Sequence, residues 1–304
     1  MSTSPEIICL GRCTVDIMNL VDHFPSGDDL IRVIDSSLQG GGPIATAAAA
    51  AARLGASVAV VDCIGDDWRG DLIREQFELQ HVSTRLLQVL PGKTSTQSVL
   101  LVEAGSGRRA IINAHGDTPD PQYSNGLLFA LDHCRILHIT GTYPETVRMA
   151  ISRAKPHGVK ISFDGGAGLF REEDRAILQH VDWLICARDY AEKLTGHTAP
   201  QQMLAGMAGW GAEICGITFG EEGSWFRDEQ GAVFHQPAFP VEPVVDTTGC
   251  GDSFHGAFLF ARLKGYSAQK AAQLAAAVAA INARTLGGRA GLPDLETTEK
   301  FINL

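Results

Sequence analysis

The stretch Asp246-Thr247-Thr248-Gly249-Cys250-Gly251-Asp252 follows Val244-Val245, which we interpret as the end of a strand, and precedes residues 254–263, which have the pattern of a helix. At such a junction, free backbone N–H groups and the positive end of the helix dipole favour an anion. Its glycines let the backbone approach a ligand closely. Asp252 adds a carboxylate, which can cap the helix or act as a base beside developing negative charge.

The composition of the chain indicates a globular protein that binds neither nucleic acid nor a membrane. The 304 residues are 45% hydrophobic, which is enough for a sizeable core. The net charge is −10 and no block is rich in Lys and Arg, which disfavours nucleic acid as a partner. The longest apolar run, residues 44–52, is too short to cross a bilayer.

The seven cysteines indicate a reducing environment. Their number is odd and no pair has the CxxC spacing. We therefore expect free thiols in a cytoplasmic protein, and neither a disulfide framework nor a zinc site. Residues 1–6 are polar and lead directly into a strand-like run, so no signal peptide is expected. His115, His133, His138 and His180 show no metal-ligand spacing either, which favours structural roles.

The order of apolar runs predicts an α/β fold. Strand-like runs alternate with helical segments, and this alternation predicts a mostly parallel sheet with helices on both faces. The strand-like runs are residues 7–10, 58–64, 135–139, 159–163, 183–186 and 214–219. A hairpin is predicted at 225–234. Short strands and loops at 17–39 and a hairpin at 96–113 predict a small β-sheet lid. We expect one domain, 1–304, with lid segments at about 13–40 and 94–118.

Two further sequence features predict ligand contacts. Asp16 follows the first strand, at the edge where open α/β sheets bind ligands, although a surface turn would also explain it. Gly40-Gly41-Gly42-Pro43 precedes an Ala-rich helix and offers a second place where the backbone can approach a ligand.

In order and spacing, these features resemble the ribokinase-like PfkB family of carbohydrate kinases. The resemblance rests on Asp16, Gly-Gly-Pro at 41–43, the hairpin lid, Thr-x-Gly-x-x-Gly at 218–223 and the 246–252 stretch. It covers nearly the whole chain and implies a three-layer α/β/α fold with a mostly parallel central sheet and a small β-sheet lid. Gly-Gly-Gly-Pro-Ile-Ala-Thr at 40–46, His-Gln-Pro-Ala-Phe at 235–239 and Gly-Gly-Arg-Ala-Gly-Leu-Pro-Asp at 287–294 are most similar to the sulfofructose kinase branch.

The resemblance implies a kinase that transfers the γ-phosphoryl group of ATP to a sugar hydroxyl. Asp252 matches the family's general base, and the N–H groups of Gly249, Cys250 and Gly251 would form an anion hole. The positions matching sugar contacts are Asp16, Gly41, Gly42, Thr46 and Asn113. The positions matching nucleotide contacts are Thr218, Gly220, Gly223, Gly249, Gly251 and, near the adenine, Asn282. Arg108 and Arg109 on the lid are either sugar contacts or solvated charges.

The resemblance also implies metal ions. Magnesium accompanies ATP, and potassium would lie near Asp246 and Thr248 with the 284–288 loop. The family's Asn-x-x-Glu motif for magnesium aligns with Ala187-Arg188-Asp189-Tyr190, so both named residues are missing. Magnesium would then be held mainly by nucleotide and water, with Asp164 or Asp189 as the only protein candidates, since Mg²⁺ keeps several waters.

Other departures concern the acceptor. Thr46 replaces the family's Asn, as in the sulfofructose kinase branch. Leu30 and Gly141 stand where a sulfonate would need Lys and Arg, since sulfonate recognition requires strong donors. We therefore expect a ketose, pentose or acidic sugar as acceptor. A nucleoside kinase of the same fold and a non-catalytic sugar or nucleotide sensor are the alternatives, and a homodimer formed through the lid strands is the expected assembly.

Overall fold

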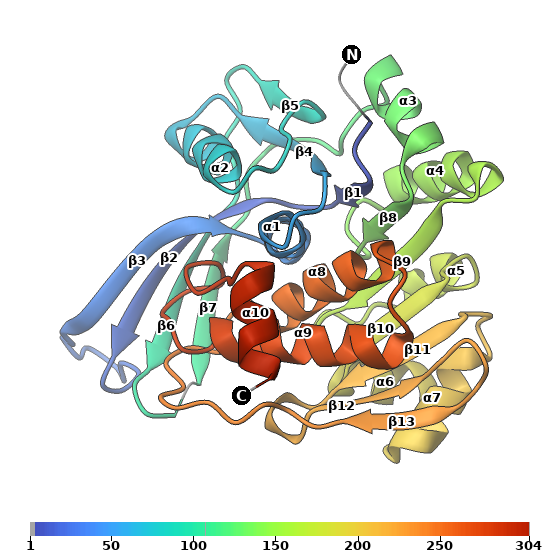
Figure 1. Ribbon diagram of the computed structural model, residues 1–304. Coiled ribbons are helices and arrows are strands. Elements are labelled where there is room, and N and C mark those ends of the chain that lie inside the picture. The colour runs from blue at the N-terminus through green and yellow to red at the C-terminus, as the bar shows by residue number, and fades with distance from the viewer. Residues whose placement is uncertain (1–3, 107, 304) are drawn as a thin grey trace.

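In the computed structural model of the protein, which describes residues 4–106 and 108–303, nine strands form the larger of two sheets (Figure 1). Their order is β13 (Val233–Gln236), β12 (Ser224–Arg227), β11 (Ile214–Thr218), β10 (Trp183–Ala187), β9 (Lys160–Gly165), β8 (Ile136–Ile139), β1 (Ile7–Leu10), β4 (Val58–Gly65) and β5 (Leu87–Leu90). Within this sheet, β11, β10, β9, β8, β1, β4 and β5 are parallel to one another. Strands β12 and β13 continue the sheet as an antiparallel hairpin.

Helices cover both faces of this sheet. Successive residues of a strand point to opposite faces, and in β1 Ile7 and Cys9 belong to one hydrophobic core, whereas Ile8 and Leu10 belong to the other. The first core contains residues of α1 (Pro43–Arg53), α2 (Trp68–Leu79), α8 (Cys250–Leu263) and α9 (Ala268–Asn282), with α10 (Leu295–Ile302) beside them. The second contains residues of α3 (Asn125–His133), α4 (Pro144–Ala154), α5 (Arg175–Leu178), α6 (Arg188–Thr195) and α7 (Pro200–Ala208).

The smaller sheet projects from one end of the larger one (Figure 1). Its strand order is β3 (Val33–Gly41), β2 (Thr14–Val21), β6 (Gln97–Glu103) and β7 (Arg109–Ala114). One face packs inward through Met18, Leu100 and Val102 against Leu286 of the C-terminal region. The predicted fold class, a three-layer α/β/α protein with a small β-sheet lid, is confirmed.

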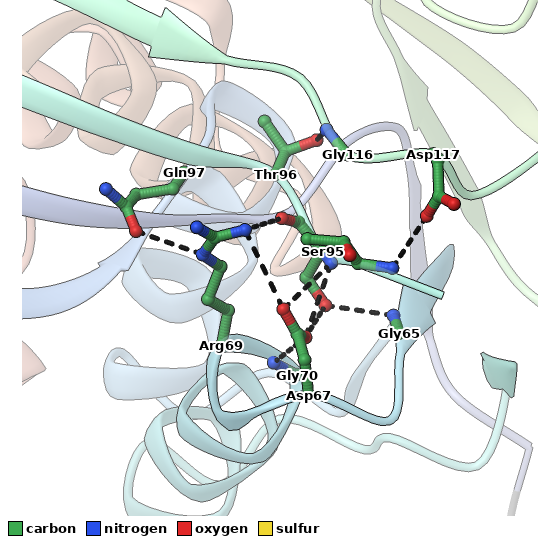
Figure 2. Close-up of polar contacts among 10 residues, drawn as sticks. Gly65, Asp67, Arg69, Gly70, Ser95, Thr96, Gln97, Gly116 and Asp117 are labelled. Atoms are coloured by element: carbon green, nitrogen blue, oxygen red, sulfur yellow. Dashed lines mark hydrogen bonds and ion pairs between the residues drawn. The ribbon is translucent and has the colours of Figure 1, made fainter. Parts of the chain in front are cut away.

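A polar network attaches the lid to the larger sheet (Figure 2). Asp67 follows β4 and caps α2, since its Oδ1 accepts a hydrogen bond from Gly70 N at 3.0 Å. The same Oδ1 accepts from Ser95 Oγ at 2.7 Å, and Ser95 Oγ accepts from Gly65 N at 2.9 Å. Arg69 donates from Nε to Gln97 Oε1, at the first residue of β6. The end of β4 therefore fixes the start of the lid strand β6.

The structure corrects two expectations about the 246–252 stretch. Val244-Val245 is not the end of a strand, because β13 ends at Gln236 and an irregular segment leads from there to α8. Helix α8 begins at Cys250 rather than at residue 254, so Gly251 and Asp252 lie within its first turn. The apolar pattern begins only at Phe254, whereas glycine has a low helix propensity, which concealed the first turn.

Three other expectations can be compared with the structure. Residues 17–39 contain most of β2 and β3, two long paired strands, where short strands and loops were predicted. All seven cysteines are free, as predicted. In the described part of the chain, none of the helices combines the length and the apolar character needed to span a bilayer.

Candidate active site

The first turn of α8 presents backbone donors. Gly249 precedes the helix with a φ of +72°, in the left-handed region that glycine adopts easily. Cys250 N donates to Thr247 O at 3.3 Å, whereas the next two N–H groups, of Gly251 and Asp252, have no hydrogen-bond partner among residues 4–106 and 108–303. Free N–H groups at a helix N-terminus attract an anion. Of the three predicted anion-hole donors, Cys250 is thus already engaged in a turn.

The loop before α8 is fixed by Asp246, which is fully buried. Its Oδ1 accepts from Thr248 N at 2.8 Å, and its Oδ2 accepts from Gly287 N at 2.9 Å. Gly249 lies directly against Gly288, since a Cβ on Gly249 would be 2.6 Å from Gly288 Cα. The two loops expected to hold a monovalent cation are therefore in contact, and the buried Thr248 Oγ1 has no partner in the described structure.

Asp252 is partly buried, and its surroundings disfavour its charged form. The pKa of Asp252 is raised from 3.8 to about 7, chiefly by burial and next by the nearby Asp164 carboxylate, while His255 and Arg109 oppose the shift. A carboxyl group with a pKa near neutrality is suited to general base catalysis, because it accepts a proton readily yet is ionised in a large fraction of molecules. Asp252 therefore combines the position and the electrostatics of a base.

A cavity of about 920 Å³ opens beside the first turn of α8. It is bounded by α8, α9, the segment before α8 and the loop that follows β11, with the lid residues Gly105 and Ser106 at its edge. Its walls include five residues predicted to contact the nucleotide or its phosphates: Thr218, Gly220, Gly223, Cys250 and Gly251. A volume of this size suits a ligand as large as a nucleotide.

Asn282, predicted to lie near the adenine, does not line this cavity. It is fully buried at the end of α9, and its Nδ2 donates to Gly288 O at 2.9 Å. Its neighbours Ala279, Ala280 and Ala283 do line the cavity. The small side chains of α9 leave the space in which a planar base could lie.

The lid presents a polar row, and one of its members, Asp16, is near enough to Asp252 to act on its pKa. Strand register places Asp16 opposite Gln39 on β3 and Ser98 on β6, and Ser98 opposite Asn113 on β7. Asn113 Nδ2 donates to Ser98 Oγ at 2.9 Å, and Thr14 Oγ1 donates to Asp16 Oδ1 at 2.7 Å. Burial raises the pKa of Asp16, although the Arg289 charge opposes this. The two predicted sugar contacts Asp16 and Asn113 thus share one face of the lid.

Arg289 is a candidate site residue for which the sequence predicted no role. Its Nη2 donates to Gly41 O at 2.7 Å and its Nε to Thr46 Oγ1 at 3.1 Å. Its backbone N donates to Gln39 Oε1 at 3.1 Å. The guanidinium therefore holds the glycine turn and Thr46 in place, and both were predicted sugar contacts. The Gly-Gly-Arg stretch at 287–289 was visible in the sequence, but its partners are about 240 residues away.

Arg289 places a positive charge in the interior of the protein. The side chain is only 4% exposed, and burial lowers its pKa to about 10. It forms no ion pair within the described structure, although Asp16 and Asp252 are near enough to stabilise its charge. It thus lies near the lid carboxylate and the candidate base. Buried charges are costly unless hydrogen-bonded, and the hydrogen bonds to Thr46 and Gly41 offset part of this cost.

Two lid arginines differ in their placement. Arg109 Nη1 donates to Thr247 Oγ1 at 3.1 Å, so β7 touches the loop before α8. Arg108 instead pairs with Glu103 within the lid hairpin, from Nη2 to Oε1 at 2.8 Å. Of the two, only Arg109 contacts the candidate site.

The side chains at the position of the magnesium motif do not form a ligand set. Tyr190 is buried and donates its hydroxyl to Asp174 Oδ2 at 2.9 Å, and Asp189 Oδ2 accepts from Gly168 N at 2.7 Å. Asp164 faces His255 instead. These residues do not fit a protein-held magnesium ion.

Comparison with known proteins identifies the family. Residues 4–295 match the family described as pfkB family carbohydrate kinase. The chain is 26% identical to the ATP-dependent 6-phosphofructokinase of Thermoanaerobacterium thermosaccharolyticum, over 98% of this chain and 94% of that protein. The structure of Arabidopsis thaliana ribokinase complexed with ribose and ATP superposes with a TM-score of 0.86 at 22% identity, covering 99% of this chain and 100% of that one.

A nucleoside kinase from Methanocaldococcus jannaschii has the same fold, with a TM-score of 0.80 at 20% identity over 99% of both chains. The match over residues 4–295 shows that the chain belongs to the pfkB family of carbohydrate kinases. The expected enzyme class, a phosphotransferase that acts on an alcohol group, is confirmed.

Replacing Arg289 with Met should weaken acceptor binding. The variant keeps the length of the side chain but leaves Gly41 O and Thr46 Oγ1 without a donor, which costs on the order of 1–3 kcal/mol. We expect KM for the acceptor to rise about tenfold or more, measured by steady-state kinetics, with KM for ATP nearly unchanged. Arg289→Lys keeps the charge without the planar fork. Full acceptor affinity in both variants would contradict the assignment.

Proposed function

We propose that the chain transfers the γ-phosphoryl group of ATP to a hydroxyl of a small carbohydrate. One observation carries this proposal: Asp252, with its pKa raised to about 7, lies in the first turn of α8, where Cys250 and Gly251 line the 920 Å³ cavity, and it is near enough to Asp16 of the lid to feel its charge. In this arrangement the nucleotide occupies the cavity. The sugar binds between the lid and the glycine turn at 40–42.

The chemistry follows from the placement of these groups. Asp252 accepts the proton of the sugar hydroxyl as the oxygen attacks the γ-phosphorus, and ADP leaves on the far side. The free N–H groups of Gly251 and Asp252 and the dipole of α8 stabilise the charge on the phosphoryl oxygens. Asp16 and Asn113 hold sugar hydroxyls from the lid. Magnesium accompanies ATP through phosphates and water, and potassium near Asp246 and Thr248 belongs to the same proposal.

The acceptor is proposed to be a ketose, a pentose or an acidic sugar. The motif resemblance favours the sulfofructose kinase branch, whereas Leu30 and Gly141 lack the cationic side chains a sulfonate needs. Leu30 is 90% exposed on the lid. Arg171 reaches the space over Gly141, where a Cβ would be 2.2 Å from its Nη2. The Asp174 Oδ1 atom would be closer still, at 2.0 Å, and this carboxylate pairs with Arg171, so the positive charge near Gly141 is already balanced.

A panel of acceptors with ATP and magnesium tests the proposal. We expect acceptor-dependent ADP release with at least one of sulfofructose, fructose, ribose and 2-keto-3-deoxygluconate, and much less with adenosine. Preference for adenosine would favour the nucleoside kinase, which needs an aromatic slot for the base, whereas lid residues 17–39 offer only His23 and Phe24. ATP and sugar binding by calorimetry without any ADP release would indicate a sensor. A cytoplasmic location remains a prediction.

The outer face of the lid supports the proposed homodimer. Strand register aligns four aliphatic side chains in one row across all four strands: Leu38, Ile17, Val99 and Ile112. The outermost two are 52% and 62% exposed. The opposite face packs against Leu286, in the C-terminal part of the chain, so this row lies on the other face of the lid. The lid of a second copy of this chain, which carries the same row, would cover it.

The double variant Leu38→Glu/Ile112→Glu should convert a dimer into a monomer. It places like charges at both ends of the row that the proposed dimer would bury. Light scattering after size exclusion measures the mass. Leu79→Glu on α2, at a residue 65% exposed, is the matched control and should stay dimeric. A wild-type monomer at working concentration would overturn the proposed dimer without affecting the proposed catalysis.

A further inference from the structure

A buried cluster of metal-ligating side chains lies one helical turn from Asp252. His138 comes from β8, Asp164 from β9 and His255 from α8. One potential ligand atom from each residue lies within 4.8 Å of the others. The three side chains are 0–4% exposed. Three ligand-type side chains from three separate elements thus converge in a place without solvent.

Each member of the cluster has a polar atom that lacks a partner. His138 Nε2, Asp164 Oδ2 and His255 Nδ1 are buried and form no hydrogen bond in the described structure. Unsatisfied buried polar atoms are rare, because each costs on the order of 1–3 kcal/mol. Three such atoms in one cluster show that its polar groups are not fully satisfied by one another.

The surroundings orient the cluster as a metal site requires. His138 Nδ1 is bonded to Ser162 Oγ at 3.1 Å, which fixes the ring and leaves Nε2 directed into the cluster. A ligating histidine typically uses its second nitrogen in this way. His255 Nε2 and Asp164 Oδ1 are 3.1 Å apart, a separation that two ligands of one small ion can have. A second cavity of about 240 Å³ has Asp164 in its wall.

From this geometry we propose that His138, Asp164 and His255 bind a divalent transition-metal ion of the zinc type. Two imidazoles and one carboxylate suit such an ion. Magnesium is disfavoured, because it prefers oxygen ligands. The site is therefore distinct from the magnesium that accompanies ATP. Sequence spacing did not reveal it, since the ligands are 26 and 91 residues apart along the chain.

Metal analysis of the purified chain tests the site without reference to activity. After treatment with a chelator and reconstitution with Zn²⁺, we expect about one equivalent per chain by mass spectrometry of the metal and a higher melting temperature. Co²⁺ should give visible absorption typical of a four-coordinate site with nitrogen ligands. A folded wild-type chain that retains no Zn²⁺ and shows no Co²⁺ absorption would overturn the proposal.

Variants locate the ion. His255→Asn and His138→Gln should each abolish the Co²⁺ absorption, whereas His180→Asn, at an exposed histidine, should retain it. Circular dichroism establishes that each variant is folded. If both cluster variants fold and keep the Co²⁺ spectrum, the metal binds elsewhere and the proposal is wrong. If they do not fold, the wild-type metal content still decides the question.

Discussion

Asp252→Asn should lower kcat by a factor of roughly a hundred or more, as expected for loss of a positioned general base. The amide has nearly the same shape but does not accept the hydroxyl proton. Because the substitution leaves the cavity and the N–H groups of α8 intact, ATP affinity should be unchanged by calorimetry. Near-normal turnover in the variant would remove Asp252 from the mechanism.

Stability separates this effect from misfolding. The pKa of Asp252 is raised in the folded state, so the carboxyl stabilises the fold below its unfolded pKa of 3.8 and loses that contribution as the pH rises through about 7. At pH 8 the wild-type residue is a charged group in an unfavourable place, whereas Asn is neutral. The variant should therefore melt at the same temperature as the wild type or higher. A lower melting temperature would attribute the lost activity to misfolding.

The same pKa predicts a pH profile. The base must be ionised to act, so kcat/KM should rise with pH through a midpoint near 7 and then level off. A midpoint near 4, typical of a solvent-exposed carboxyl, would contradict the raised pKa.

The parts of the site predicted from sequence depend on local signals. Glycines before a helix, hairpin turns and alternating strands each report the conformation of a few adjacent residues. They were sufficient to predict the lid and the nucleotide loop, and Thr218, Gly220, Gly223 and Gly251 do meet in one cavity. Their catalytic and binding roles remain predictions, since they rest on the resemblance and on the cavity geometry.

The remaining features depend on contacts between distant segments. Arg289 acts on Gly41 and Thr46, and the His138, Asp164 and His255 cluster joins three elements. Nothing in the local sequence of an arginine or a histidine reveals which residues it will meet. The Val244-Val245 prediction failed for a related reason: β-branched residues favour strands only where a partner strand is available, and here Val244 lines the nucleotide cavity instead.

Gly251→Ala should reduce phosphoryl transfer without disturbing the fold. Gly251 is the second residue of α8 and lines the large cavity, and a Cβ there would have no atom within 4 Å. Alanine has a helix propensity about 1 kcal/mol better than glycine, so the melting temperature should stay the same or rise. The added methyl group would occupy the space in which the phosphoryl oxygens approach the free N–H groups. We expect kcat/KM for ATP to fall roughly tenfold to a hundredfold, as for loss of an oxyanion donor.

The chain offers a matched control for this substitution. Gly126 is the second residue of α3, and a Cβ there would make its closest contact at an ordinary 3.7 Å. Gly126→Ala should therefore change stability by a similar amount and leave activity unchanged. Gly249→Ala would be less informative, because its methyl group would be 2.6 Å from Gly288 and would distort the loop itself. If Gly251→Ala keeps full activity with steady-state kinetics like those of Gly126→Ala, the phosphoryl group does not approach the first turn of α8, and the proposed anion hole is wrong.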